Sequence, residues 1–235
     1  MKFAVMQPYF FPYFGYFQLL NAVDVFVVYD NVEFSKKGWF HRNRLLFNGR
    51  IEMFTINLVK DSDYLDVVDR RVSEIYMSEE RHRILRKVKQ YYRQAPYFET
   101  IFPFLEQVFL FESTNLFQYI YNSIVETCKL LGIKTDIIVS STLPIDHSLR
   151  NKYRIFEMAK HLNIRRYINP IGGQDLYSVD DFASHGIELS FLRPSLSPYP
   201  QLGTSEFVPA LSIIDMIMNL DLAEVRSRLS EYELV

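Results

Sequence analysis

The sequence predicts an α/β protein built on an open, mostly parallel sheet of the Rossmann-like type. Short runs of consecutive apolar residues recur along the chain, which is typical of strands buried on both faces of a parallel sheet. Segments of helical periodicity separate most of these runs. One Asn-Gly pair lies between two apolar runs, and this signal adds a β-hairpin to the predicted fold.

The N-terminal segment contains the first predicted unit. Phe3–Gln7 is a continuous apolar strand that Pro8 and Pro12 terminate. Apolar residues then follow helical spacing over residues 16–20, and Val25–Tyr29 is a second continuous apolar strand. Strand, helix and strand form a βαβ unit, so we expect parallel strands and a right-handed crossover.

A hairpin and a long helical segment come next. Arg44–Phe47 and Ile51–Leu58 are the expected strands of the hairpin, with Asn48-Gly49 at its turn. From Ser78 to Gly132 the pattern is helical. Ser78 is the expected N-terminal cap, Pro96 and Pro103 are expected to divide the helices, and Gly132 is the expected C-terminal cap.

Strands and helices alternate again after this segment. The predicted strands are Asp136–Val139, Arg166–Ile168 and Ile187–Leu192, and the predicted helices are Lys152–Asn163, Val179–Gly186, Pro209–Leu220 and Leu222–Leu229. The sequence contains no repeat, low-complexity tract or linker. We therefore predict a single α/β domain over residues 1–235, with residues 75–132 as a helical insertion.

Composition excludes several classes of protein. The chain has 26 basic and 28 acidic residues, whereas nucleic-acid-binding proteins usually carry a basic excess. Prolines interrupt the apolar N-terminal segment, which lacks the form of a signal peptide, and no apolar run is long enough to span a membrane. Cys128 is the only cysteine, so an internal disulfide is excluded. We expect a cytoplasmic protein that binds no nucleic acid and does not insert into membranes.

The expected site lies outside the carboxyl ends of the strands, where open parallel sheets bind their ligands. Polar residues follow several of the predicted strands at this edge. The candidate substrate-binding residues are Gln7, Tyr9, Lys36, Lys37, Trp39, Arg42, Asn43, Arg44, Asn169, Gly172 and Gly173. Gln7 either braces its loop or hydrogen-bonds a substrate. The two glycines would let a ligand approach the backbone closely.

Asp30 and His41 are the candidate catalytic residues. Partial desolvation raises the pKa of a carboxyl group at the mouth of a buried strand, so Asp30 could act as a base. The alternative for Asp30 is an ion pair with Lys36 or Arg42. His41 could transfer protons because the ordinary pKa of histidine lies near neutrality, and the alternative is a histidine with no catalytic role.

The segment Lys36–Arg44 is the densest in charged groups. It holds four cations, one histidine and the only tryptophan of the chain. Arginine forks bind phosphate through two hydrogen bonds, so this segment is a candidate clamp for a diphosphate or a phosphopantetheine group. The alternative is a solvated basic loop before the hairpin. We predict no metal site, because Asp146 and His147 have no further ligands near them in sequence.

Several sequence blocks resemble the WbqC-like protein family. The N-terminal block is MQPYFFPYFGYFQLLNAVDVFVVYDNVEFSKKGWFHRNR, and the C-terminal blocks are RYINPIGGQDLY, GIELSFL and FVPALSIIDMIMN. The resemblance covers nearly the whole chain and is weakest in the helical middle. His41 is a departure from the family pattern, which has asparagine before the Arg-Asn pair.

The resemblance implies an enzyme of bacterial surface-polysaccharide biosynthesis, such as that of O-antigen or capsule. The leading expectation is a transferase that acylates or aminoacylates a nucleotide-activated amino sugar. Its partners would be the nucleotide-sugar substrate and an acyl or aminoacyl carrier protein or a coenzyme A thioester. The resemblance identifies no cofactor.

Two alternative functions stay open. The first is a nucleotidyltransferase-like enzyme, although the histidine pair of that class is missing after Gly15. The second is a non-catalytic binding or scaffold protein of polysaccharide assembly. A scaffold would show a large exposed apolar patch and no deep pocket.

Overall fold

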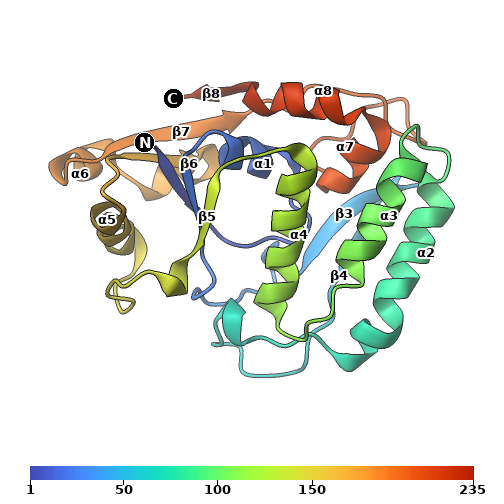
Figure 1. Cartoon of the computed structure of the whole chain (residues 1–235), viewed down its shortest axis with the longest axis horizontal. Helices are drawn as coiled ribbons and strands as arrows, with labels where there is room; N and C mark the ends of the chain where they lie inside the picture. The colour runs from blue at the N-terminus through green and yellow to red at the C-terminus, as the bar shows by residue number, and fades with distance from the viewer.

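The computed structural model describes residues 1–235 and contains a six-stranded sheet and a separate two-stranded hairpin (Figure 1). The sheet strands are β1 (Phe3–Met6), β2 (Val25–Val28), β5 (Asp136–Val139), β6 (Arg166–Pro170), β7 (Glu188–Pro194) and β8 (Tyr232–Leu234). Their order is β5-β2-β1-β6-β7-β8, and every pair is parallel except β7 and β8. The predicted α/β fold with a mostly parallel sheet and a hairpin is confirmed.

The direction in which strands are added reverses between β1 and β6. From β1 the chain passes through α1 (Phe14–Asn21) to β2, and β5 then joins the far side of β2. The chain returns through α5 (Asn151–Leu162) to β6, which pairs with the other side of β1. Such a reversal leaves a crevice outside the carboxyl ends of the two strands that flank it.

The central strands are buried on both faces, which explains their continuous apolar runs. Val25 and Val27 of β2 pack on one face, in a core shared with α5 and α6 (Val179–Ser184). Phe26 and Val28 pack on the opposite face, in a larger core that includes α1. Because alternate residues of one strand reach two different cores, no polar residue interrupts the strand.

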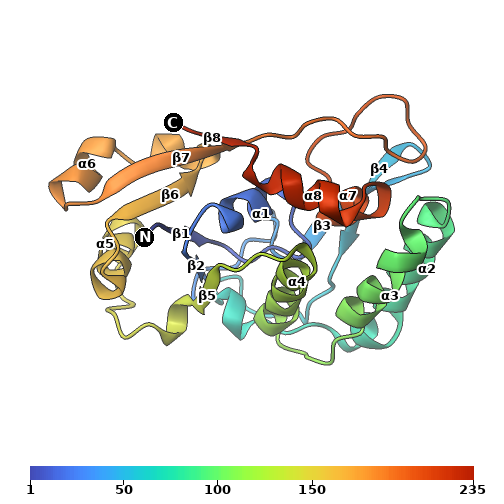
Figure 2. The same ribbon diagram turned by 45° about the horizontal axis from the view of Figure 1, so that its top comes forward.

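The helical insertion consists mainly of α2 (Arg81–Tyr92), α3 (Phe98–Phe109) and α4 (Leu116–Leu131). These helices stand beside one another at the end of the molecule opposite α5 and α6 (Figures 1 and 2). Their buried faces belong to the same continuous core as α1 and one face of the sheet. This shared core supports the proposal that residues 75–132 are an insertion in one α/β domain.

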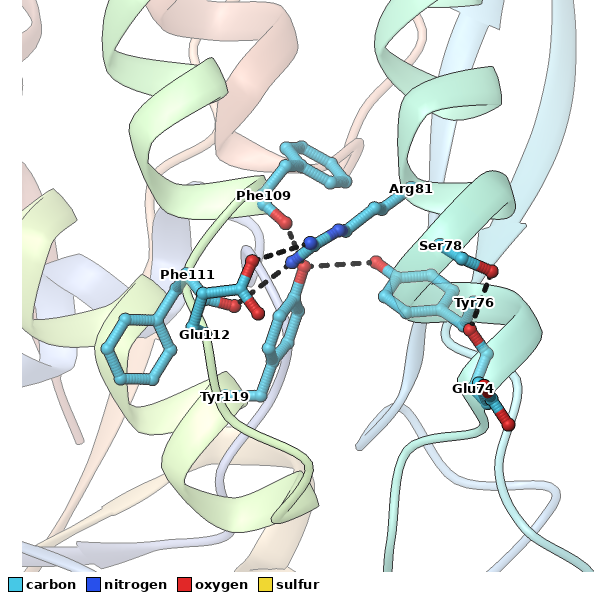
Figure 3. Close-up of polar contacts among 8 residues, drawn as sticks. All are labelled: Glu74, Tyr76, Ser78, Arg81, Phe109, Phe111, Glu112 and Tyr119. Atoms are coloured by element: carbon cyan, nitrogen blue, oxygen red, sulfur yellow. Dashed lines mark hydrogen bonds and ion pairs between the residues drawn. The ribbon is translucent and has the colours of Figure 1, made fainter.

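A polar cluster joins the start of α2 to the residues between α3 and α4 (Figure 3). Arg81 Nη2 lies 2.7 Å from Glu112 Oε1, and Arg81 Nη1 donates to the Phe111 carbonyl at 3.3 Å. The Tyr119 hydroxyl donates to the Phe109 carbonyl at the end of α3. The cluster therefore supplies partners for two carbonyls that the end of a helix leaves free.

Two expectations for the helical segment are wrong. Ser78 does not cap α2, because it lies inside a π-helical turn, Tyr76–Glu80, and donates its hydroxyl to the Glu74 carbonyl at 3.0 Å (Figure 3). Pro103 lies within α3 and does not divide two helices. The proline costs α3 one backbone hydrogen bond, and we attribute the continuity of this helix to the burial of its apolar face.

The hairpin comprises β3 (Arg42–Phe47) and β4 (Arg50–Thr55). Its turn residues Asn48 and Gly49 have φ angles of 51° and 73°, the positive values that a two-residue type I′ turn requires. A Cβ atom on Gly49 would lie 2.6 Å from the carbonyl oxygen of Gly203, so the turn also packs closely against a later loop. The Asn-Gly prediction is confirmed, although β4 ends earlier than the predicted Leu58.

The C-terminal helices are α7 (Ile213–Asn219) and α8 (Leu222–Ser227), and the latter is followed by a 3-10 turn. The predicted helix from Pro209 starts later because Ala210 has a φ angle of 53°, which lies outside the helical region, and Ser212 caps α7. Strand β8 was not predicted. None of the helices combines the length and apolar character needed to cross a membrane.

Candidate functional site

A cavity of about 560 Å³ lies at the crevice between the carboxyl ends of β1 and β6. Its wall contains six tyrosines, four amide side chains and two arginines, but no acidic residue, lysine or histidine. The polar wall residues are Gln7, Tyr9, Tyr13, Tyr16, Tyr29, Asn31, Arg150, Asn151, Arg154, Tyr167, Asn169 and Tyr177. Its position agrees with the rule that placed the predicted site at this edge of the sheet.

Gln7 follows β1 directly and is held by two tyrosines. The Tyr9 hydroxyl donates to Gln7 Oε1 at 3.2 Å, and the Tyr16 hydroxyl donates to the Gln7 carbonyl at 3.1 Å. Gln7 Nε2 has no acceptor within the chain, so its N–H groups are free to donate to a ligand. Burial raises the pKa of Tyr9 to about 12, so its hydroxyl stays protonated at neutral pH.

Asn169 lies at the end of β6 and is fixed from two sides. The buried Tyr167 hydroxyl donates to Asn169 Oδ1 at 3.0 Å. A Cβ atom on Gly173 would lie 2.0 Å from Asn169 Nδ2, so any side chain at position 173 would force this amide to move. A Cβ atom on Gly172 would meet no atom within 4 Å, so that position is not restricted in the same way.

Substituting Gly173→Ala should therefore displace the Asn169 amide and leave the Tyr167 hydroxyl without its acceptor. We expect the free energy of unfolding to fall by about 1–3 kcal/mol, the cost of one unpaired buried polar group. Gly172→Ala should change it by less than about 0.5 kcal/mol. Urea unfolding of both variants measures the difference. Equal losses in the two variants would contradict the close packing of Gly173 against Asn169.

Arg154 is a buried arginine of α5 with no acidic partner. Its Nε donates to the Leu149 carbonyl at 2.8 Å, its Nη1 donates to the Asn31 carbonyl at 3.1 Å, and its Nη2 donates to the His147 carbonyl. The guanidinium also lies over the Tyr29 ring, with 5.1 Å between its Cζ atom and the ring centroid. These neutral partners hold the guanidinium in place without cancelling its charge.

Arg150 adds a second positive charge to the same wall. It is exposed, and its side chain makes no hydrogen bond or ion pair within the chain. Arg150 is the N-cap of α5, and Asn151 and Arg154 come from its first turn, where free N–H groups strengthen the positive field. Since no carboxylate lines the wall, the cavity suits a ligand that carries negative charge.

The loop between β1 and α1 is anchored by residues outside the cavity. Phe11 has a φ angle of 43°, which is strained for a residue other than glycine. Asn43 Nδ2 donates to the Phe10 and Phe11 carbonyls at 3.2 and 2.6 Å, and Ser212 Oγ donates to the Phe11 carbonyl at 2.8 Å. Asn43 therefore braces the loop that positions Gln7 and does not line the cavity itself.

Asp30 is buried behind the cavity wall. Its Oδ1 accepts hydrogen bonds from Ser140 Oγ at 2.8 Å and from the Ser141 backbone N–H at 2.9 Å. These bonds tie the end of β2 to the end of β5, and Asp30 forms no ion pair with Lys36 or Arg42. The geometry gives Asp30 a structural role, and its catalytic role stays a prediction.

The two arginines of the predicted anion clamp bind carbonyl groups of the chain. Arg42 donates to the Gly38 carbonyl at 3.0 Å and to the Lys37 carbonyl. Arg44 donates to the Ala210 carbonyl at 3.2 Å. Neither arginine lines the cavity, because both are carried away from it on the hairpin.

The other residues of this segment also lie outside the cavity. Trp39 is partly exposed and lies near the guanidinium groups of Arg42 and Arg44, with 6.0 and 5.9 Å between their Cζ atoms and the centroid of its ring. Lys36 forms an exposed ion pair with Asp63. Lys37 is exposed, and His41 lies in a different hollow. Binding of an anion by this segment stays a prediction.

The cavity thus brings together five of the predicted residues, namely Gln7, Tyr9, Asn169, Gly172 and Gly173. Arg150 and Arg154 were missed. The sequence contained a signal for Arg150, because this residue lies two positions before the start of the predicted helix 152–163. The N-terminus of a crossover helix faces the same edge of the sheet as the strand ends.

The sequence model of the WbqC-like protein family matches residues 7–227. This chain belongs to the WbqC-like protein family. It is also similar to the uncharacterized protein Rv1507c of Mycobacterium tuberculosis, with 25% identity over 224 residues that cover 93% of this chain and 94% of that protein. No solved structure matches the chain.

The family match confirms the resemblance inferred from the sequence blocks. It extends from the cavity residue Gln7 to Ser227 at the end of α8, so all of the cavity wall except Val5 and Met6 lies within it. The arrangement of Arg150, Arg154 and Asn169 is therefore a feature of the matched part of this WbqC-like protein.

Proposed function

We propose that this WbqC-like protein is a transferase of bacterial surface-polysaccharide biosynthesis that attaches an acyl or aminoacyl group to a nucleotide-activated amino sugar. The observation that carries the proposal is the cavity at the point where the sheet reverses, whose only charged side chains are Arg150 and Arg154. The negative charge of a diphosphate would complement these two arginines, because the wall contains no carboxylate. The volume of about 560 Å³ is in the range of small-molecule sites.

The remaining wall residues suit the other parts of such a ligand. Tyrosine rings offer flat faces to a nucleobase and hydroxyls that orient it, and six tyrosines line the cavity. Gln7 Nε2 and the Asn169 amide offer hydrogen bonds to sugar hydroxyls from the two strands that flank the reversal. A scaffold protein needs no such concave set of polar groups, so the cavity favours an enzyme.

The absence of an acid or a histidine from the wall fits transfer to an amine. The sugar amine attacks the thioester carbonyl of the donor, so a C–N bond forms and the C–S bond breaks. The proton lost by the amine is taken up by the departing thiolate. Because an amino-sugar amine is partly unprotonated near neutral pH, the main requirement is orientation of the two reactants.

A binding screen tests the proposal. Nucleotide amino sugars linked through UDP, GDP or dTDP should raise the melting temperature of the wild-type protein, because a ligand that binds only the folded state stabilises it. Arg150→Ala should weaken the binding roughly tenfold, by removing one charge-assisted contact. The stability of this variant without ligand should match the wild type, since Arg150 is exposed and unpaired.

Arg83→Ala is the matched control, because Arg83 is an exposed arginine of α2 and lies outside the cavity. It should bind the nucleotide sugar as the wild type does. No stabilisation by any nucleotide sugar would contradict the proposed substrate class. Loss of binding in Arg42→Ala with normal binding in Arg150→Ala would move the site to the predicted clamp on the hairpin.

A further inference from the structure

A second hollow, of about 460 Å³, contains a buried arginine without any partner. Arg70 is only 3% exposed, yet none of its guanidinium nitrogens donates a hydrogen bond within the chain. Its Nε and Nη2 atoms are both fully buried. The guanidinium lies over the Phe34 ring, with 4.8 Å between Arg70 Cζ and the ring centroid.

A buried charge in this state is costly. Burying a guanidinium without hydrogen bonds or a counter-charge opposes folding, and proteins normally pair such groups. No carboxylate of the chain forms an ion pair with Arg70. Its missing partner is therefore to be sought outside the chain, in a ligand that enters the hollow.

The neighbours of Arg70 in the hollow favour an anion. His41 Nδ1 is buried and also lacks a partner, and its ring lies 5.0 Å from the Phe34 ring. Burial, with a smaller effect of Arg42 and Arg70, lowers the pKa of His41 to about 4, so this histidine is neutral at neutral pH and can donate one hydrogen bond. Lys60 lies on the wall and has no ion-pair partner.

The remaining charged groups of the hollow lie at its rim. Lys36 is paired with Asp63. Asp61 is exposed and accepts a hydrogen bond from the Ser62 backbone N–H. Asp63 feels the Arg70 charge, which helps to lower the pKa of its carboxyl group, but neither carboxylate forms an ion pair or a hydrogen bond with the Arg70 guanidinium.

Two aromatic rings separate this hollow from the cavity at β1 and β6. The Phe34 ring contacts the Phe40 ring, with 5.6 Å between their centroids, and the Phe40 ring contacts Tyr9 of the cavity at 6.0 Å. No residue lines both spaces. The hollow is thus a separate space and not an extension of the cavity.

We propose that this hollow is a second binding site, in which Arg70 and His41 hold the oxyanion group of a small ligand. A guanidinium fork matches the paired oxygens of a phosphoryl or carboxylate group, and a neutral imidazole adds one donor. Lys60 strengthens the attraction from the rim. The inference goes beyond the proposed transferase function, because it rests on residues that the nucleotide-sugar cavity does not use.

The Arg70→Met variant tests the site, because it should raise the melting temperature but lower the affinity for an anion. Without an added anion the variant should melt at a higher temperature than the wild type, because it no longer buries an unpaired charge. In calorimetric titrations with inorganic phosphate and with malonate, it should bind the preferred anion roughly tenfold or more weakly than the wild type does. The anion that wild type prefers identifies the group as phosphoryl or carboxylate.

Arg71→Met is the matched control, because Arg71 is the adjacent, exposed arginine and lies outside the hollow. It should keep the wild-type affinity. Phosphate also suits the Arg150–Arg154 cavity, so each titration is repeated in the Arg150→Ala background, where the part that depends on Arg70 must persist. Because Arg150 lines only the first cavity and Arg70 only the second hollow, anion binding that persists in this background depends on the second hollow, whether or not the first cavity binds a nucleotide sugar.

His41→Leu provides a second, independent variant, which decides the question if Arg70→Met does not fold. It should bind the anion severalfold more weakly, since one donor is lost. Lower stability of Arg70→Met together with unchanged anion affinity would make Arg70 a structural residue and overturn the proposal. Absence of anion binding by the wild-type protein would overturn it as well.

Discussion

Arg154→Met is expected to weaken the binding of a nucleotide sugar roughly hundredfold, which corresponds to the loss of about 2.8 kcal/mol of charge-assisted hydrogen bonding. Arg154 is buried in the cavity wall, has no acidic partner and is held by backbone carbonyls. Its charge is therefore already oriented before a ligand arrives. Such a preorganised contact contributes more to affinity than the exposed Arg150 does.

The same substitution is also expected to lower the free energy of unfolding by about 3 kcal/mol. The carbonyls of Asn31, His147 and Leu149 would lose their donor. Arg154→Lys keeps the charge but not the fork, so we expect intermediate values for both stability and affinity.

Titration with a nucleoside that carries no phosphate separates the two effects. If Arg154 binds the diphosphate, the variant should lose affinity for the nucleotide sugar and keep the weak affinity for the nucleoside. Proportional losses for both ligands would show that Arg154 acts only by shaping the cavity. The difference in affinity between wild type and variant should also shrink at high salt, where charge–charge attraction is screened.

Asp215→Ala is expected to lower the free energy of unfolding by about 3 kcal/mol or more, because three donors would lose their acceptor. Asp215 is fully buried in α7. Its Oδ1 accepts from the Tyr92 hydroxyl at 2.7 Å, and its Oδ2 accepts from the Tyr199 hydroxyl at 2.7 Å and from Gln201 Nε2 at 2.9 Å. The carboxylate thereby ties α2 and the loop before α7 to one point.

The dependence of stability on pH provides a second measurement at this site. Burial raises the pKa of Asp215 above its ordinary value, although hydrogen bonds from Tyr199, Tyr92 and Gln201 oppose the shift. The extra stability that comes from this pKa shift is therefore fully present below the unfolded pKa of about 3.9 and is lost as the pH rises through the folded pKa, while the hydrogen bonds to the carboxylate remain. Asp215→Asn removes this titration, so the wild type should gain stability relative to that variant as the pH falls.

Urea unfolding at several pH values measures both effects. Asp180→Ala is the control, because Asp180 is an exposed aspartate in the first turn of α6. It should change stability far less than Asp215→Ala does. A difference between wild type and Asp215→Asn that stays constant with pH would contradict the raised pKa.

Most of the fold could be predicted because the sheet is buried on both sides. Val25–Val28 shows only apolar residues for this reason, and such a run is visible in the sequence. Asn48-Gly49 was equally informative, because few other residue pairs adopt two positive φ angles. Strand β8 was missed because a three-residue strand at the edge of a sheet leaves no apolar pattern.

The candidate site could be predicted only in part. Gln7 and Asn169 were found because ligands bind outside the carboxyl ends of parallel strands. Gln7 directly follows β1, and Asn169 lies at the carboxyl end of β6. The segment after β2 does not line the cavity, because Asp30 turns toward β5 and the chain then leaves the edge to form the hairpin. Catalysis by Asp30 and anion binding by this segment stay predictions. Arg154 could not be recognised by spacing, because its burial depends on the carbonyls of a loop that has no pattern of its own.

The pairing of β1 with β6 has a consequence for how this chain folds. Phe3 of β1 pairs with Tyr167 of β6, so the central strand finds its second neighbour only across five intervening helices. During synthesis β1 and β2 leave the ribosome long before β6 and can pair with each other first, while the other edge of β1 stays open. Contacts so distant in sequence slow folding and lengthen the time during which an apolar strand is exposed. The crevice that forms the cavity is thus completed late, after β6 has been added beside β1.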